Sequence, residues 1–262
     1  MTTINRQTYS LLEDLSKEDI FKEHKATLIG GTALAYHYGH RESFDIDICF
    51  PHNENLPKLP FIKKFNLIKN EFNNFIKDSA INEGGDIDTQ IQRYIQKDTG
   101  LKVDFVVNTG SNIYESEILK NDLYATSFNN ITIASPEVLF KQKSLLLLDR
   151  NKIRDLYDVA YLINKEKFTS KEIINTIKTY RITYTDKDII RLLAAKQPNK
   201  LDIINEPISL AKIQDLTEYT KLKSYLLTSI DKSLSAKNKL KEFIKCKEAT
   251  KDKSIKKNGI ER

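Results

Sequence analysis

The sequence predicts an α/β fold of the α+β kind, in which a small mixed sheet with flanking helices comes first and a helical domain follows. Short apolar and β-branched runs, which are typical of buried strands, are concentrated in the first half of the chain. After Ser135 the apolar residues recur instead at helical spacing. We therefore divide the chain near Ser135, into a first domain at 1–134 and a helical domain with a basic tail at 135–262.

The composition is that of an ordinary globular protein. Its 262 residues are enough for one large domain or two modest ones with proper cores. No apolar run approaches the roughly 18 residues that a membrane span needs, and the first residues do not resemble a signal peptide. We expect a cytoplasmic protein with no membrane partner, in which Cys49 and Cys246 are reduced thiols.

The positive charge is concentrated at the C-terminal end. The net charge is +6, and residues 231–262 hold eleven Lys or Arg against five Asp or Glu, so the rest of the chain is neutral overall. A basic arm suits a nucleic-acid partner, because lysine and arginine neutralise phosphates. A solvated helix end that merely keeps the protein soluble would give the same pattern, and the sequence leaves both interpretations open.

A short central stretch combines two predicted strands with a glycine turn. Residues 26–29 are an apolar run that predicts a buried strand, and residues 43–50 predict a second one. Between them, Gly30-Gly31-Thr32 predicts a tight turn that opens a helix over 33–38. Glycine lets the backbone approach a phosphate closely, and the free N–H groups of the helix favour an anion. The turn is therefore a candidate phosphate-binding element.

Asp45 and Asp47 lie two residues apart on the second of these strands, so their side chains share one face. Two adjacent carboxylates repel each other unless a cation or a proton lies between them. Hard oxygen ligands that leave coordination sites open suit Mg²⁺ or Mn²⁺, which complete their shells with water and nucleotide phosphates. An isolated D-x-D can also be a solvated strand edge, but the glycine turn upstream favours the metal interpretation.

A third carboxylate, Asp104, lies in the middle of the apolar run 102–107, which predicts another buried strand. An unpaired buried charge is costly, so its presence needs a reason. We expect Asp104 to be a third metal ligand or a catalytic base beside the other two acids, since such a triad can hold two Mg²⁺ ions. The alternative is a carboxylate on an edge strand that faces water.

Apolar spacing and turn residues predict the remaining elements of the first domain. The spacing predicts helices at 5–22 and 61–77, the second with a stripe of phenylalanines that we assign to the core. Two strand-like runs around Gly84-Gly85 predict a hairpin over 81–95, where Asp86 and Asp88 compete for the role of third carboxylate but look exposed. Residues 51–60 and 108–121 are expected to be loops, and 131–134 a short strand.

The second half of the chain predicts helices almost throughout. Ser135, Pro136 and Glu137 are typical of a helix start, with a capping hydroxyl, a proline in the first turn and an acid near the positive helix end. That helix is expected to run to about residue 148. Further helices are predicted at 152–164, 170–180, 185–196 and 209–247.

A second group of charged residues lies between 141 and 158. Lys143 and Arg150 are two helical turns apart, so they can face the same side of one helix. A triphosphate needs positive charge on its outer oxygens, which these two side chains would supply. Asp158 could approach an attacking hydroxyl as a base, and Asp155 could orient Arg154 or Lys143. The alternative is surface salt bridging, worth about 0.2–0.5 kcal/mol per pair.

His40 and Arg41, just before the acidic strand, are further candidates. Arg41 could clamp a phosphate, or it could pair with Asp45 or Glu42. The other histidines show no ligand spacing, and we assign them no role.

One motif resembles a known family. It reads Gly30-Gly31-Thr32-Ala33-Leu34-Ala35 followed by Gly39-His40-Arg41-x-Ser43-x-Asp45-x-Asp47, and it is similar to the opening motif of the AbiEii/AbiGii-type nucleotidyltransferase toxins of the polymerase-β-like nucleotidyltransferase superfamily. The similarity recurs at Lys143, Arg150 and Arg154-Asp155-Leu156-Tyr157-Asp158. It covers about residues 25–165, and the last hundred residues add little to it.

The resemblance implies a polymerase-β-like catalytic domain that transfers a nucleotide from a nucleoside triphosphate to RNA, with the 3′ end of a tRNA as a candidate acceptor. It also implies a cognate antitoxin as partner, and it implies that Lys143 and Arg150 contact the nucleotide. In this hypothesis Asp45 and Asp47 hold Mg²⁺, with Asp104 as a third acid. Gly30, Gly31 and Thr32 would seat the β- and γ-phosphates.

Two other functions remain open. The same site could transfer a nucleotide or a phosphate to a protein hydroxyl, or the fold could serve only to bind nucleic acid or a partner. The intact D-x-D argues against the second of these. The sequence has no G-x-x-x-x-G-K-[ST] loop, which excludes a P-loop ATPase, and no nucleophile motif of a hydrolase.

Overall fold

The computed structural model describes residues 4–72, 77, 86–107, 113–197, 218–233 and 235. In these residues seven strands form one mixed sheet in the order β3-β4-β5-β2-β1-β7-β6. The strands are β1 (Thr27–Ile29), β2 (Asp45–Phe50), β3 (Leu67–Lys69), β4 (Ile91–Gln96), β5 (Lys102–Val107), β6 (Thr126–Phe128) and β7 (Ile131–Ile133). The central strand β2 runs antiparallel to β1 and parallel to β5.

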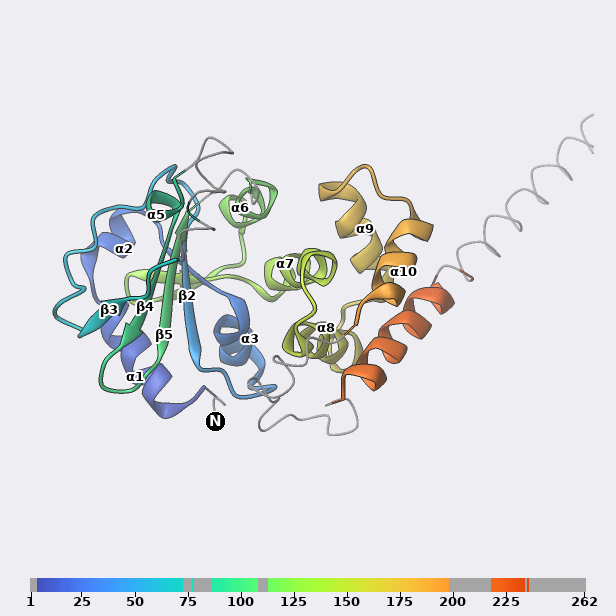
Figure 1. The fold of residues 1–262 in the computed structure, drawn as a ribbon, viewed down its shortest axis with the longest axis horizontal. Coiled ribbons are helices and arrows are strands. Elements are labelled where there is room, and N and C mark those ends of the chain that lie inside the picture. Colours follow the sequence, from blue (N-terminus) through green and yellow to red (C-terminus); the bar gives the residue numbers. More distant parts are fainter. Residues whose placement is uncertain are drawn as a thin grey trace, which may run out of the picture.

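Helices lie on both faces of the sheet and make up the part of the chain that follows it. They are α1 (Arg6–Leu15), α2 (Asp19–Glu23), α3 (Gly30–Tyr38), α5 (Ile87–Gln90), α6 (Ile113–Lys120), α7 (Pro136–Asp149), α8 (Ile153–Lys165), α9 (Ser170–Tyr180) and α10 (Asp186–Ala195), and residues 219–233 are helical as well. Figure 1 shows α1 and α2 on one side of the sheet and α3, α6 and α7 on the other. The helices from α8 onward lie beyond α7, away from the sheet.

The alternation of side chains along β2 and β5 decides which face is core. Ile46, Ile48 and Phe105 are fully buried, and Phe105 packs against Phe21 of α2 with ring centroids 6.3 Å apart. Because successive residues point to opposite faces, the aspartates between them point to the other side, toward α7 and α8. The aromatic core under α2 therefore fixes the direction of the acidic face.

Most predicted elements are confirmed, including the α/β class, the strands at β1, β2, β5 and β7, and the helices α7 to α10. The Ser135 hydroxyl accepts from the Val138 N–H at 3.4 Å, as a helix cap should. In the described part of the chain, no helix is long and apolar enough to cross a membrane. The division of the chain at residue 135 stays a prediction.

Four predicted elements are wrong. The helix expected over 5–22 is two helices, because the chain turns at Ser16, whose hydroxyl donates to the Glu13 carbonyl instead of continuing the helix. The helix expected over 33–38 begins earlier, at Gly30. Residues 113–120, expected in a loop, form α6, and β6 was not predicted.

The fourth error is the helix expected over 61–77. Residues 60–66 form turns and the chain then enters β3, which pairs with β4. Phe61 is buried in the aromatic core, 5.2 Å from Phe21 and 5.7 Å from Phe105 between ring centroids, and Phe72 is buried as well, so the core assignment is confirmed for these two. Residues 73–76, with Phe75, lie outside the described residues. The side chains reach the core from successive turns rather than from a helix.

Some predictions fall partly or wholly outside the described residues. Of the hairpin over 81–95, the residues 81–85 lie outside, 87–90 form α5, and β4 supplies the second strand. Of the helix over 209–247, the part at 219–233 is described and helical. Nearly all of the basic tail lies outside the described residues.

Candidate active site

Strand pairing brings the three candidate acids to one region of the sheet. Asp47 and Asp104 are register partners on the parallel strands β2 and β5. Asp45 lies two residues before Asp47 and on the same face of β2. On the other side of β2, Ile29 is the register partner of Asp47, so the chain enters α3 directly beside the Asp47 carboxylate. The acids and the first turn of α3 therefore form one site.

Gly30 is required by this close approach. Its φ is +75°, a left-handed conformation that side chains rarely adopt. A Cβ placed on Gly30 would collide with the Asp47 Oδ2 atom. The Asp47 carboxylate therefore packs directly against the backbone at the start of α3. Gly30 is needed to make room for this carboxylate, in addition to any role in phosphate binding.

Two of the three carboxyl groups, those of Asp47 and Asp104, have raised pKa values. Burial raises the pKa of Asp47 to about 6, and the neighbouring Asp104 and Asp45 add to the shift. Burial also raises the pKa of Asp104, partly against the opposing effect of Arg93. Burial and the neighbouring acids thus make ionisation of Asp47 and Asp104 less favourable than it is in water.

Two of the three acids are paired with arginines. Arg154 of α8 lies 3.3 Å from Asp45 Oδ2, and Arg93 of β4 lies 3.4 Å from Asp104 Oδ2. Among the described residues no ion pair reaches Asp47. Of the three acids, Asp47 is therefore the one without an ion-pair partner in this part of the chain.

The donor set fits a magnesium-type cation. In the described part of the chain, no group of three or more His, Cys, Asp or Glu side chains is arranged to hold a metal ion unaided. Mg²⁺ requires less than that, because it keeps several waters and takes one or two carboxylates together with substrate phosphates. Asp45 and Asp47 offer such a partial shell, and their raised charge density is what a divalent cation relieves.

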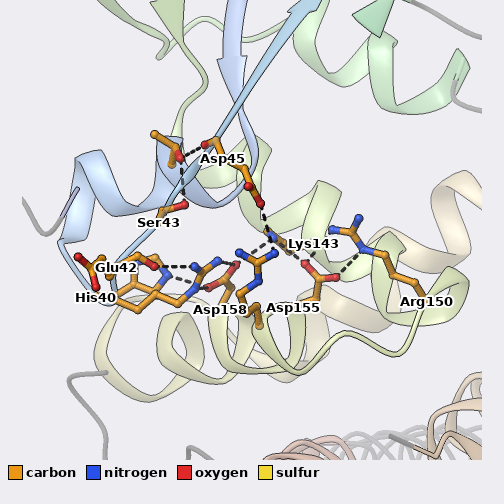
Figure 2. Close-up of polar contacts among 11 residues, drawn as sticks. His40, Glu42, Ser43, Asp45, Lys143, Arg150, Asp155 and Asp158 are labelled. Carbon is orange, nitrogen blue, oxygen red and sulfur yellow. Dashed lines mark hydrogen bonds and ion pairs between the residues drawn. The ribbon is translucent and has the colours of Figure 1, made fainter. Parts of the chain in front are cut away.

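Facing the acids, α7 and α8 carry a buried network of ion pairs (Figure 2). Asp155 accepts from Lys143 Nζ at 2.6 Å and from Arg150 at 2.5 Å and 3.0 Å. Burial works against the ionised form of Asp155, but Lys143 and Arg150 outweigh it and lower its pKa to about 2. Lys143 and Arg150 are thus held together by one carboxylate, and orienting Lys143 is one of the two roles that the sequence left open for Asp155.

Asp158 is the centre of the deeper half of the network. Fully buried, it accepts from His40 Nε2 at 2.8 Å and from Arg41 at 2.6 Å and 2.9 Å, and Lys143 Nζ lies 2.9 Å away. Despite the opposing effect of burial, these partners hold the pKa of Asp158 well below its usual range. Such a carboxylate is badly placed to accept a proton from a hydroxyl, so the geometry argues for an anchoring role.

Arg41 and Gly31 belong together. The Arg41 guanidinium is buried on Asp158, and a Cβ at Gly31 would lie 2.6 Å from its Nη2 atom. Burial lowers the pKa of Arg41, but Asp158 more than compensates and leaves it raised. Gly31 therefore makes room for an arginine that ties the turn before β2 to α8.

Thr32 is turned into the protein. Its side chain is fully buried, and its hydroxyl bonds the Asp45 carbonyl and lies 2.9 Å from Ser43 Oγ. The hydroxyl thus fixes the start of the acidic strand. A phosphate in the cavity would meet the backbone of this turn rather than the threonine side chain.

A cavity of about 460 Å³ lies between the acids and the cations. One wall is the sheet with the first turn of α3, and the other is formed by α7 and α8. Its lining includes the predicted residues Gly30, Gly31, Arg41, Asp45, Asp47, Asp104, Lys143 and Arg150. Thr32 and Asp158 lie behind this lining.

Comparisons with known proteins agree with the motif. The family model described as "Nucleotidyl transferase AbiEii toxin, Type IV TA system" matches residues 11–228. The chain belongs to the AbiEii family. The match extends well beyond the region at 25–165 that carries the motif, and it takes in both the sheet and the helices that follow.

The AbiEii-family chain also resembles solved structures. The structure entitled "Crystal structure of JHP933 from Helicobacter pylori" matches with 18% sequence identity over 92% of this chain and 99% of that chain, at a TM-score of 0.47. No curated protein matches the sequence.

The structure places further charged residues in the site of this AbiEii-family protein, of which Arg154 and Asp155 were already candidates from the motif and Arg93 was not. Arg93 and Arg154 line the cavity and pair with the acids, and Asp155 joins two of the cations. The sequence signal for Arg154 and Asp155 was their place beside Asp158 in the motif. Arg93 gave no local signal, because only the pairing of β4 with β5 sets it opposite Asp104.

The rejected candidates Asp86 and Asp88 are engaged elsewhere. Asp86 caps α5 by accepting from the Asp88 N–H at 3.0 Å, and Asp88 pairs with Lys69 and Lys77 at 3.1 Å each. Neither lines the cavity.

Proposed function

We propose that this protein is a magnesium-dependent nucleotidyltransferase that moves a nucleotide from a nucleoside triphosphate to RNA, with the 3′ end of a tRNA as a candidate acceptor. One observation supports this most directly. Asp45, Asp47 and Asp104 on the sheet face Lys143 and Arg150 across a cavity of about 460 Å³. This volume lies within the range of small-molecule and cofactor sites.

The two walls suit the two ends of a metal-bound triphosphate. Asp45 and Asp47 would hold Mg²⁺, which, when bound, offsets the negative charge of the phosphates and of the departing pyrophosphate. Lys143 and Arg150, fixed by Asp155, would neutralise the outer phosphate oxygens. The backbone N–H groups at Gly30 and Gly31 would take a phosphate oxygen at the helix start.

In the proposed reaction an acceptor hydroxyl attacks the α-phosphorus, its proton passes to a carboxylate, and pyrophosphate leaves. Asp104 is a better candidate for the proton acceptor than Asp158, because Asp104 lines the cavity and burial raises the pKa of its carboxyl group. Asp104 could instead complete the metal shell. Arg93, its present partner, would then have to move aside.

Transfer to a protein hydroxyl remains the second candidate, since the same site chemistry would serve it. A regulatory antitoxin protein is proposed as a partner on the strength of the family description alone.

The test is an acceptor and label experiment. The protein is incubated with Mg²⁺, total RNA and a cell lysate, in parallel reactions with each nucleoside triphosphate labelled at either the α or the γ phosphorus. We expect α-label in RNA and no γ-label, and loss of transfer in Asp47→Asn. Label in protein would favour the second candidate. No transfer with any nucleotide, or wild-type transfer by Asp47→Asn, would overturn the proposal.

A further inference from the structure

A second cavity lies on the far side of α6 from the catalytic one. It has a volume of about 420 Å³ and is lined by the ends of α2 and α6, the residues after β2, and the starts of β1 and β7. Leu119 of α6 lines both cavities, so the C-terminal end of this helix forms a shared wall between them. Nothing in the catalytic arrangement accounts for this second groove.

The groove is basic. Lys22, Lys25 and Lys120 line it together with His52. Lys120 pairs with Glu117 at 2.7 Å, whereas no ion pair among the described residues reaches Lys22 or Lys25, both of which are exposed. Burial lowers the pKa of His52, and the nearby Lys25 and Lys120 lower it further, as a region of positive potential should.

The groove has little negative charge to offset these lysines. Asp122 is the one acid among the described residues that line it. Its carboxylate accepts from two backbone N–H groups, of Ser135 at 2.7 Å and of Tyr124 at 3.2 Å. The remaining polar lining consists of hydroxyl and amide side chains: Thr27, Ser127, Asn129, Asn130 and Thr132. Most of them already hydrogen-bond within the protein, so the lysines supply the groove's attraction for phosphate.

An exposed aromatic side chain lies between Asp122 and Ala125, two residues that line the groove. The turn that begins at Asp122 presents Leu123, 89% exposed, and Tyr124, 76% exposed, to solvent. The bond from Asp122 to the Tyr124 N–H fixes this turn, and the next residue, Ala125, lines the groove again. Two large apolar side chains held in solvent need a reason, and a stacking surface for a base is one.

Lysines for phosphates and an aromatic ring for bases are the combination that binds single-stranded nucleic acid. We propose that the groove between α2, α6 and the β6–β7 hairpin binds a single-stranded segment of a nucleic acid, with Lys22 and Lys25 on its phosphates and Tyr124 against a base. This inference rests in part on the proposed function, because a strand that crosses α6 from this groove enters the catalytic cavity. The groove thus takes the acceptor, and the catalytic cavity takes the nucleotide.

The test measures binding rather than catalysis. A short fluorescein-labelled single-stranded RNA, and a DNA of the same sequence, are titrated with the full chain without nucleotide at several salt concentrations, and anisotropy is recorded. The double variant Lys22→Gln/Lys25→Gln is compared with Lys171→Gln/Lys187→Gln, which removes the same charge from exposed lysines of α9 and α10. We expect the groove variant alone to lose about tenfold in affinity and about 1.4 in the slope of log affinity against log salt, at about 0.7 per phosphate contact.

The aromatic contact has its own pair of variants. Tyr124→Ala should lose about fivefold or more in affinity, whereas Tyr124→Phe, which keeps the ring, should bind like the wild type. Equal affinity for RNA and DNA would support recognition by phosphate and stacking alone, and a preference for RNA would add a contact to the 2′-hydroxyl. Equal affinity of the groove and control variants would overturn the inference and leave the groove to a protein partner.

The two proposals fail in different ways. If no transfer is found but the groove variants still weaken binding, the proposed function is wrong and the binding site stands. If RNA is modified equally well by the groove and control variants and binds both equally, the function stands and the binding site is wrong.

Discussion

At the scale of single residues, Asp47 is the acid of the site whose surroundings most disfavour its ionised form. It is an acid with two acidic neighbours, a pKa of about 6 and no ion pair among the described residues. In the unfolded chain its pKa returns to the ordinary 3.8, so the folded protein binds the proton more tightly than the unfolded one does. The ionised carboxylate therefore opposes folding in the absence of a cation.

We predict that Asp47→Asn stabilises the metal-free protein at neutral pH. Below the unfolded pKa both states are protonated and the effect is absent, and it grows as the pH rises and is complete above about 6. Because the pKa of Asp47 is 3.8 in the unfolded chain and about 6 in the folded one, the gain in the free energy of unfolding is at most about 3 kcal/mol. Urea unfolding in EDTA at pH 4 and pH 7 measures it. A variant that is less stable than the wild type at pH 7 would contradict the prediction.

Gly30 allows a test of close packing against the same acid. Gly30→Ala should lose transfer activity and destabilise the fold, because it adds both backbone strain and a collision with Asp47. Gly100→Ala is the matched control, since Gly100 also has a positive φ, +73°, but open space around it. It should cost only the strain, about 1–2 kcal/mol, and keep activity. If Gly30→Ala and Gly100→Ala had equal effects in thermal melts and transfer assays, the collision with Asp47 would contribute nothing to the loss.

At the scale of elements, the turn before β2 is held to α8 by Asp158. This one carboxylate contacts His40, Arg41 and Lys143, which come from the turn and from α7. His40 also stacks on Tyr157 of α8, with ring centroids 6.0 Å apart and the rings nearly parallel. The position of the acidic strand relative to the cations thus depends on a buried contact outside the cavity.

We predict that Asp158→Asn costs about 3–5 kcal/mol of stability, because it leaves buried cations without their counter-charge. Asp155→Asn should cost less, since Lys143 keeps Asp158 and the Arg150 side chain is 42% exposed. Urea unfolding of both variants at neutral pH makes the comparison. If Asp158→Asn unfolds like the wild type but has lost transfer, Asp158 acts in catalysis and the anchoring role is wrong.

At the scale of the whole molecule, the proposed function depends on a ligand that spans the acids of the sheet and the cations of α7 and α8. A ligand that binds only the folded state stabilises it by about 2.7 kcal/mol at one hundred times its dissociation constant. We predict that Mg²⁺ with a nucleoside triphosphate raises the melting temperature more than either does alone. Asp45→Asn and Arg150→Gln should each remove the joint effect. A triphosphate that stabilises Asp45→Asn fully would contradict the two-walled site.

Much of the fold could be predicted from the sequence because its signals are local. The alternation in β2 and β5 predicted both strands and the shared face of Asp45 and Asp47, and the cap at Ser135 predicted the start of α7. The errors arose where a local pattern allows two structures. Phenylalanines spaced as in 61–77 fit one helix face, but they also fit successive turns above a core. Three-residue strands such as β3 and β6 are too short to show a period.

The residues of the candidate site could be predicted from the sequence, but the ion pairs between them and the directions of their side chains could not. The motif indicated Asp45, Asp47 and the cations, and the apolar run around Asp104 indicated the third acid, whereas the ion pairs among these residues could not be inferred. Arg154 reaches Asp45 and Asp158 reaches Arg41 across more than one hundred residues of sequence. No local spacing rule connects such positions, so the anchoring role of Asp158 and the inward turn of Thr32 needed the structure.

The sequence by itself determined the α/β class, the shared face of Asp45 and Asp47 on their strand, and the family of this chain. Each of these follows from the periodicity or the motif of a short segment. The tertiary structure decided which acid is left unpaired, which one is buried as an anchor, and that a basic groove lies beyond α6. Those properties depend on desolvation and on charges brought together from distant segments, and both exist only once the chain has packed.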